Sequence, residues 1–563
     1  MPFPQVWQLE QFFPHPGTDE FRAVVDDWRK RWTSLADASE NLASASGPAA
    51  KKVWGDFVER WSLLIAESED LFSFLHCHAA ADAENKVFQQ WEATLGAISP
   101  IRARVGVNVE FAVRGADGST AASVARVSEL IAADARLAPV RFALDEAARN
   151  AAFRLPKAEE LLAADLSVDG IQAWSRLYDR LSGSLKIEVM EKGEVVRKSP
   201  GQIHFDSPDR SVRQNNFYAA DKAWQTLADT CADSLNHIAG FRLAKYRRSG
   251  HSHLDWPLRL NRMQHSTLKA MWDVVTQRKG VLLKYLDRKA KLLGLQKLSW
   301  YDMQAPLPET WHMLPACDSK SSQEEKAHKR EACATELSYE EACRQILETF
   351  TRFSPDFGEF AKMAMSEGWI EVENRAGKRQ GAYCTGFPVR KQSRIFMTYT
   401  NTPDSMSTLA HELGHAYHSW VLRDQPFLLQ DYPMNLAETA STFAETVLAE
   451  ERLAAAKTSA EKLAVLDGML GDAVAFLMNI HARFVFEDRF HQERAAGEVS
   501  AERLSQLMLE AQQETYQNGL ADDGWYPGFW ISKLHFYINS WPFYNFPYTF
   551  GYLLSQGVYA LRS

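Results

Sequence analysis

Cysteine is scarce in this sequence. The 563 residues include six cysteines, and no two of them form a Cys-x-x-Cys pair. In a chain of this length, so few scattered cysteines argue against a disulfide framework. They are Cys77, Cys231, Cys317, Cys333, Cys343 and Cys384. We therefore expect reduced thiols and a cytoplasmic location.

An excess of positive charge is also absent. Lys and Arg total 63 against 72 Asp and Glu, which gives a net charge of −9. Because nucleic-acid binding draws on basic surface that releases counterions, we expect no nucleic-acid partner. The main basic cluster, "KYRRSGHSH" (245–253), is typical of a solvated helix end or loop.

Long apolar runs are missing as well. No stretch of about eighteen apolar residues occurs, so we expect no membrane span. The first residues, "MPFPQVWQLEQFFPHPG", do not show the basic start and apolar run of a signal peptide. A hydrophobic share of 46% still provides material for an extensive core.

Strand-like segments are rare. Most of the chain has apolar residues three and four positions apart, as in "AERLSQLMLEAQQETYQNGL" (501–520), which predicts amphipathic helices. Alternation around Lys192-Gly193 in "SLKIEVMEKGEVVRK" (184–198) predicts a hairpin, and "SRIFMTYT" (393–400) predicts a further strand. We predict a mainly α-helical protein with a small sheet.

Domain boundaries are weakly marked. The segment 197–210 contains two prolines and a glycine and is typical of a connection. The polar and charged segment 315–336 predicts an exposed loop, and no internal repeat is visible. We predict a first helical lobe over 1–200 and a second lobe over 201–563.

One helical segment carries an unusual set of polar residues, "STLAHELGHAYHSWVL" (407–422). The Thr-Pro-Asp sequence at 402–404 predicts its start, with a capping residue, Pro at the first position and an acid in the first turn. His411 and His415 are four residues apart, so both can reach one tetrahedral cation. Glu412 lies about 100° around the helix and can lean over an open coordination position. This pattern is typical of a metallopeptidase. The alternative is a buried helix whose histidines interact with neighbouring side chains instead of a metal.

A catalytic zinc site needs a third protein ligand. The segment "YPMNLAETASTFAETVLAEE" (432–451) begins with a proline-containing turn and becomes helical. Glu438 follows His415 with 22 residues between them, enough to end one helix and pack a second against it. Ser441 and Thr442 share its face. We expect this polar face to point inward; a solvated face is the alternative.

Two further residues of these helices are candidates near the metal. Glu445 can orient a ligand histidine as a supporting carboxylate, or it can form a structural salt bridge. His418 lies seven residues after His411 on the same stripe. We expect His418 near the site without direct ligation, because Glu438 already completes the ligand set.

These segments resemble the zinc oligopeptidases of the thimet oligopeptidase and oligoendopeptidase F family, and the oligoendopeptidase F branch most. The resemblance is carried by "AHELGHAYH" and "MNLAETASTFAET". It extends to "RQGAYCTGFPVRKQSRIFMTYTNTPDSMSTLAHELGH" (379–415), "LSWYDMQAPLP" (298–308) and "HFYINSWPFYNFPYTFGYLL" (535–554). It runs from about residue 298 to the end and is loose before about residue 200.

The resemblance implies two helical lobes around a deep channel. It assigns the catalytic site, with a small sheet beside it, to the domain 201–563. It implies that His411, His415 and Glu438 bind one zinc ion per chain, and that Glu412 is the general base. The implied substrates are short unstructured peptides.

In this family a histidine and tyrosines of the C-terminal segment bind substrate and stabilise the oxyanion. The match carries over to His535, Tyr544 and Tyr548. About three extra residues separate "HFY" from "PFY" relative to the family pattern, which affects the placement of His535. Tyr552 continues the four-residue spacing, although Pro547 interrupts a continuous helix. Aromatic core packing is the alternative for the three tyrosines.

The small sheet has expected roles as well. Tyr383, in the Gly-Ala-Tyr turn of the family segment, is a candidate for substrate or supporting contacts. The strand "SRIFMTYT" is predicted to be an edge strand beside the metal, where free backbone groups can pair with an extended peptide. An internal strand is the alternative.

Two other functions remain open from the sequence. A related zinc exopeptidase, such as a carboxypeptidase, would keep the same helix pair and block the channel. A non-enzymatic helical protein would hold zinc structurally or bind peptides without cutting them. A structural site usually has four protein ligands and often uses cysteine, whereas the nearest cysteine, Cys384, lies 27 residues before His411. The sequence sets no expectation for the oligomeric state.

Overall fold

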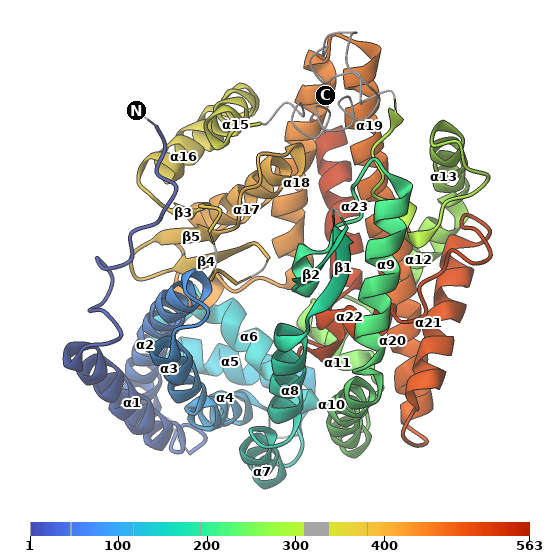
Figure 1. The fold of residues 1–563 in the computed structure, drawn as a ribbon. Helices are drawn as coiled ribbons and strands as arrows, with labels where there is room; N and C mark the ends of the chain where they lie inside the picture. The colour runs from blue at the N-terminus through green and yellow to red at the C-terminus, as the bar shows by residue number, and fades with distance from the viewer. Residues whose placement is uncertain are drawn as a thin grey trace.

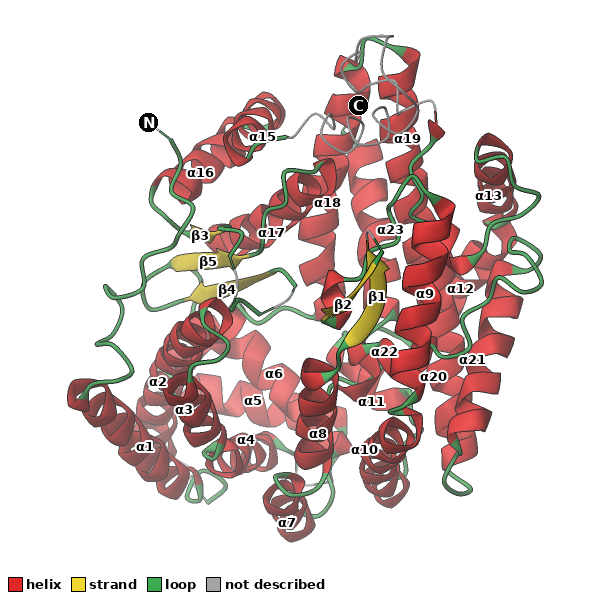
Figure 2. Cartoon of the chain, in the orientation of Figure 1, coloured by secondary structure: helices red, strands yellow, loops and turns green. Residues whose placement is uncertain are grey.

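The computed structural model describes residues 2–44, 48–115, 117–191, 193–308, 337–375, 377–379 and 381–562. Helix makes up 69% and strand 5%. Figure 2 draws the helices in red and the few strands in yellow. The prediction of a mainly helical protein with a small sheet is confirmed. The predicted exposed loop at 315–336 lies outside the described residues.

The elements follow one another as labelled in Figure 1. Those up to the predicted boundary are α1 (Asp19–Ser39), α2 (Pro48–Ala81), α3 (Lys86–Gly96), α4 (Ser99–Val113), α5 (Thr120–Ala133), α6 (Arg141–Asn150), α7 (Lys157–Ser167), α8 (Ile171–Ser184), β1 (Ile187–Glu191) and β2 (Glu194–Lys198). The next are α9 (Arg210–Gln225), α10 (Ala228–Ser249), α11 (Asp255–Leu260), α12 (His265–Arg278), α13 (Gly280–Leu292), α15 (Tyr339–Phe353), α16 (Pro355–Ser366), β3 (Ile370–Glu371), β4 (Tyr383–Phe387) and β5 (Gln392–Phe396). The last are α17 (Pro403–Leu422), α18 (Met434–Ala455), α19 (Ser459–Val474), a π-helical turn (Ala475–Asn479), α20 (Ile480–Arg494), α21 (Ala501–Tyr516), α22 (Phe529–Ser532) and α23 (Phe546–Ala560).

Helices α1 to α6 share one hydrophobic core. Trp28 and Trp32, one turn apart on α1, both donate their indole N–H to the Ser68 hydroxyl of α2, at 2.8 and 3.0 Å. Phe387 and Phe396 of the three-stranded sheet belong to the same core. The first helices therefore fix the position of the sheet, although more than 200 residues separate the two in the sequence.

The three-stranded sheet corrects one expectation. Its order is β3-β5-β4, so the strand predicted to be at the edge, β5, is the central one. β5 pairs in parallel with β3 and antiparallel with β4. The two-residue β3 is too short to leave a strand pattern in the sequence. The edge that faces the cleft belongs to β4 instead.

The hairpin predicted at 184–198 is confirmed. β1 and β2 pair antiparallel, with Glu191 opposite Glu194, and Gly193 has a φ of 86° in the turn between them. Ile187 and Val189 pack against Ala220 of α9. This contact joins residues on the two sides of position 200, and the division into 1–200 and 201–563 stays a prediction.

The basic cluster 245–253 forms a helix end, as predicted. Helix α10 ends at Ser249, and Gly250 follows in the left-handed conformation with a φ of 75°. Two of its cations have acidic partners: Lys245 pairs with Glu160 at 2.7 Å and Arg248 with Glu159 at 3.1 Å. These pairs neutralise part of its charge.

One helical stretch, 459–494, is long and apolar enough to cross a membrane by length and composition alone. It is not an unbroken apolar run, because Asp467, Asp472 and Arg483 interrupt it, and the expectation of no membrane span stays a prediction. The core helix of a soluble protein can have the same length and composition. This one includes the π-helical turn and carries the buried ionic residues Arg483 and Glu487.

Candidate metal centre and its cleft

Helix α17 carries the first two candidate ligands. It spans Pro403–Leu422, as predicted, and the Thr402 hydroxyl accepts a hydrogen bond from the Ser405 backbone N–H at its start. The rings of His411 and His415 are 4.9 Å apart and nearly perpendicular, at 82°. Both side chains therefore point to the same side of the helix.

Glu438 reaches this pair from α18. Its Oε2 lies 3.6 Å from His411 Nε2 and 3.9 Å from His415 Nε2. One donor atom from each of the three residues lies within 4.8 Å of the others. Glu438 is buried, and so are Ser441 and Thr442, so the alternative of a solvated face on α18 is wrong. Two imidazole nitrogens and one carboxylate oxygen that converge in this way fit zinc, with one coordination position left for water.

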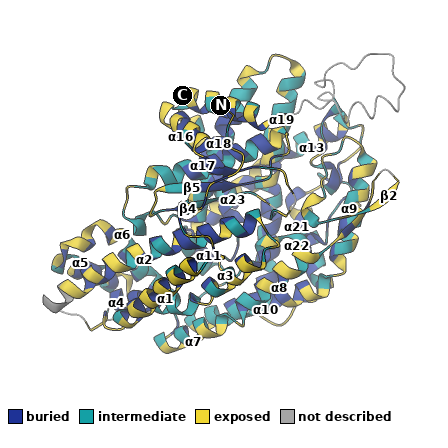
Figure 3. Ribbon diagram, turned by 60° about the vertical axis from the view of Figure 1, so that its left-hand side comes forward, coloured by how far each residue is buried: buried dark blue, intermediate teal, exposed yellow. Residues whose placement is uncertain are grey.

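Two glycines let the helices approach closely enough for this convergence. A Cβ atom on Gly414 of α17 would lie 2.8 Å from the Ala440 carbonyl oxygen of α18. A Cβ on Gly551 of α23 would lie 3.0 Å from the Glu438 backbone. Helix α18 is thus held between α17 and α23, and much of this trio is interior in Figure 3. Neither glycine was among the predicted site residues, although Gly414 lies inside the motif itself.

Glu445 and His418 lie near the ligand residues and make different contacts there. Glu445 Oε1 lies 2.9 Å from His411 Nδ1. Burial lowers the pKa of His411, but the carboxylates of Glu445, Glu412 and Glu438 together outweigh burial and raise that pKa to about 9. The His418 ring stacks on Tyr432, with centroids 4.0 Å apart. His418 is outside the three-residue cluster, as expected for a neighbour that does not ligate.

Glu412 is a buried carboxylate on the cleft wall. It is 5% exposed, and its Oε2 has no hydrogen-bond partner in the described part of the chain. Burial raises its pKa to about 7, with His411 acting in the opposite direction. A carboxyl group poised in this range can both accept and release a proton near neutral pH.

The C-terminal residues meet the site from another direction. Tyr544 and Tyr548 line the cleft, and their ring centroids are 5.6 Å apart. The His535 ring lies 5.2 Å from Tyr544 and 6.1 Å from Tyr548. Helix α23 begins only at Phe546, so Tyr544 precedes it instead of sharing its face. Tyr552 stacks on Phe476 at 4.7 Å, which is the packing alternative, and it is not among the cleft-lining residues.

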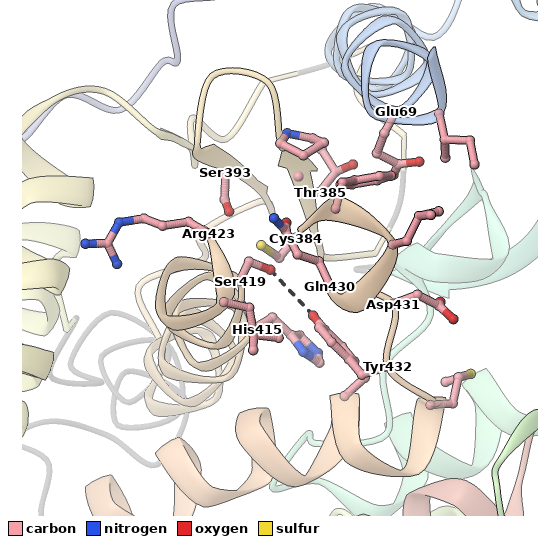
Figure 4. A pocket seen from close by; sticks show the side chains of 18 of the residues that line it. Glu69, Cys384, Thr385, Ser393, His415, Ser419, Arg423, Gln430, Asp431 and Tyr432 are labelled. Carbon is pink, nitrogen blue, oxygen red and sulfur yellow. Dashed lines mark hydrogen bonds between the residues drawn. The ribbon is translucent and has the colours of Figure 1, made fainter. Parts of the chain in front are cut away.

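The cleft has a volume of about 890 Å³ and walls from distant parts of the chain. One wall is edge strand β4, where Tyr383 stacks on Phe396 with centroids 5.2 Å apart. Trp61 and Glu69 of α2, which packs against β4, also line the cleft. Figure 4 shows Glu69 near Thr385 on one side of the pocket and His415 and Tyr432 on the other, with the Ser419–Tyr432 hydrogen bond dashed. No local sequence signal marks the α2 residues, because only the fold brings them here.

Comparison with known proteins identifies the family. The description "Peptidase family M3" matches residues 203–561, and "Oligopeptidase F" matches 120–187. An oligoendopeptidase F homolog of Lactococcus lactis is 27% identical over 72% of this chain, but the match spans only 64% of that protein. The oligopeptidase PepF of Bacillus subtilis is 23% identical over 98% of this chain and 78% of its own length.

Solved structures share the fold. An oligoendopeptidase-F from Enterococcus faecium has a TM-score of 0.64 at 18% identity, over 95% of this chain and 88% of that one. PZ peptidase A, solved with an inhibitor, has a TM-score of 0.71 at 17% identity, over 94% and 87%. Together with the family match over 203–561, these likenesses confirm the resemblance seen in the sequence: the chain belongs to peptidase family M3, a family of metallopeptidases.

Proposed function

We propose that the protein is a zinc-dependent endopeptidase that hydrolyses short, unstructured peptides. One observation carries the proposal: the buried, unpaired carboxylate of Glu412 borders the same cleft as the donor cluster His411, His415 and Glu438. One zinc ion per chain, held by these three side chains, would supply Lewis acidity that activates water and polarises the scissile carbonyl. The free thiols Cys77, Cys231, Cys343 and Cys384 are in line with a reducing compartment, which we propose to be the cytoplasm.

The residues around the ligands take the remaining roles in this proposal. Glu412 accepts a proton from the attacking water and delivers it to the leaving amine. The hydroxyls of Tyr544 and Tyr548 donate hydrogen bonds to the oxyanion that develops on the carbonyl. The free edge of β4 pairs with the backbone of an extended peptide, which gives affinity without reading every side chain.

Substrate size follows from the volume of the cleft. An extended chain can lie in a cleft of about 890 Å³, whereas a folded domain is too large for it. A related zinc exopeptidase is the second candidate, since the same ligand helices would serve it.

Blocked peptides separate these two candidates. We expect an internally quenched peptide that is acetylated and amidated to be cut at an internal bond, because an endopeptidase requires no free terminus. Metal analysis of the purified protein and mass spectrometry of the products are the measurements. Cleavage restricted to peptides with a free end would favour the exopeptidase, and no cleavage of any peptide by zinc-loaded protein would contradict both.

Glu445 provides a test of the metal site itself. Glu445→Gln weakens the contact that orients His411, so we expect zinc affinity to fall by about 10–100-fold. Competition with a chromophoric chelator measures this. Glu450→Gln, on the same helix and outside the cleft, has the same charge change and should keep the affinity. Equal zinc affinities for the two variants would show that Glu445 does not support zinc binding.

A further inference from the structure

One face of α2 lines the cleft with three side chains of different chemistry. Trp61, Ile65 and Glu69 follow one another at a spacing of four residues, so they form a stripe along the helix. Trp61 and Ile65 are half-buried against the core of the first helices, whereas Glu69 is exposed to the cleft. Ser73, four residues further on, hydrogen-bonds to Thr385 of β4 at 2.6 Å. The stripe therefore leads to the strand whose edge borders the cleft.

Glu69 has no cation in contact with it among the described residues. Its carboxylate forms no salt bridge and no hydrogen bond there. Arg102 of α4 acts on it only from a distance, because the Arg102 guanidinium lies over the rings of Trp32 and Phe72, at 5.6 and 5.2 Å. Enclosure by the protein raises the pKa of Glu69, and Arg102 offsets only part of this effect. A positive group that entered the cleft would therefore be attracted to this carboxylate.

The other charges on the cleft wall already have partners. Outside the metal centre, the pairs within the described part of the chain are Glu110 with Arg154 at 2.5 Å, Glu146 and Asp431 with Arg262 at 3.0 and 3.3 Å, and Lys391 with Asp424 at 2.6 Å. The guanidinium of Arg423 lies over the Trp420 ring, 3.8 Å from its centre. Among these described wall residues, Glu69 is thus the charge left for a substrate.

The order of the stripe indicates which group completes it. Lys and Arg side chains have an apolar stem and a cationic end, and the stem packs along apolar surface while the charge reaches a polar partner. Trp61 and Ile65 offer the apolar surface, and Glu69, one helical turn further, offers the carboxylate. We propose that Trp61, Ile65 and Glu69 form a specificity subsite for a Lys or Arg side chain of the peptide. This inference rests on the proposed peptide substrate and deepens it.

Such a subsite determines which bonds are cut. A peptide that pairs with β4 passes the stripe, because Ser73 of the same helix face contacts Thr385. Alternate side chains of an extended peptide point to the same side, so one position at a fixed distance from the scissile bond faces Glu69. The protein then favours peptides with a basic residue at that position, while pairing with β4 accepts the backbone of any sequence.

Binding to zinc-loaded Glu412→Gln protein tests the subsite without turnover. A labelled peptide is acetylated and amidated, so that neither end carries a charge. Lys is placed at each position in turn and compared with norleucine, which has a similar stem and no charge. We expect Lys to bind about fivefold more tightly than norleucine at one position, the upper end for an ion pair at an exposed site. Equal binding of the two peptides at every position overturns the proposal.

Variants of Glu69 locate the effect. In the same background Glu69→Gln should bring the Lys-to-norleucine ratio at that position close to one. Glu69→Lys should invert the charge preference, so that a peptide with Glu there binds more tightly than one with Gln. Glu84→Gln, exposed after the end of α2 and outside the cleft, changes the net charge as Glu69→Gln does and should leave the ratio intact. An unchanged ratio in Glu69→Gln, or equal weakening of both peptides, contradicts the proposal.

Hydrolysis of the same peptides by the wild-type protein is scored separately. A preference for Lys without cleavage of any peptide refutes the peptidase function and leaves the subsite standing. Cleavage of the peptides without a preference for Lys at any position refutes the subsite alone.

Discussion

Replacing Glu412 with Gln is expected to lower kcat/KM by about 10²–10⁴-fold while the protein keeps its zinc. Gln has the same size and a polar end, so it fits the space of a side chain that is 5% exposed. It cannot accept a proton from water, which removes the general base. Peptide hydrolysis and metal content are measured on the same preparation.

The control for this variant is Glu450→Gln, which has the same change in net charge on the neighbouring helix α18. It should retain both activity and metal. Because Glu412 Oε2 has no partner among the described residues, the substitution breaks no hydrogen bond at that atom, and folding is checked by circular dichroism. Metal-replete Glu412→Gln protein with activity within tenfold of the wild type would refute the role of general base.

Replacing His411 with Ala should remove bound zinc. His411 is the histidine that lies nearer to the Glu438 carboxylate, with its Nε2 at 3.6 Å. Its other ring nitrogen, Nδ1, contacts Glu445. Two remaining ligands hold zinc poorly, so the content after dialysis should fall from one ion per chain to nearly none. Atomic absorption measures the metal, and activity should disappear with it.

His418→Ala is the matched control, because His418 lies on the same helix and its ring stacks on Tyr432. This variant should keep stoichiometric zinc. If His411→Ala protein held one zinc ion per chain, or if His418→Ala lost its zinc as well, the ligand set would be different from the one proposed.

The zinc helix could be predicted from its sequence because its signals are local. The start at Thr402-Pro403, the end at Leu422 and the shared face of His411 and His415 all depend on residues within a few turns of each other. Glu438 could be predicted for the same reason, since a short connection between two helices restricts how they can pack.

Features that depend on distant contacts could not be predicted in this way. β5 has the β-branched and aromatic residues of a strand, but only its pairing with the two-residue β3 makes it central. The role of Gly551 depends on the approach of α23 to Glu438. The cleft residues of α2 reach the site through a core that joins them to the sheet. Sequence spacing contains none of this information.

The open side of β4 also has a consequence for self-association. A strand with unpaired backbone groups is a template on which other chains can aggregate. Here Ser73 of α2 hydrogen-bonds to Thr385 of β4 at 2.6 Å, and the Asp70 carboxylate accepts a hydrogen bond from the Val389 backbone N–H at 3.1 Å. The first helices thus stand beside the exposed strand, and a flat sheet edge of another molecule cannot reach it. The enclosure that admits a single flexible chain at the same time protects the protein from edge-to-edge polymerisation.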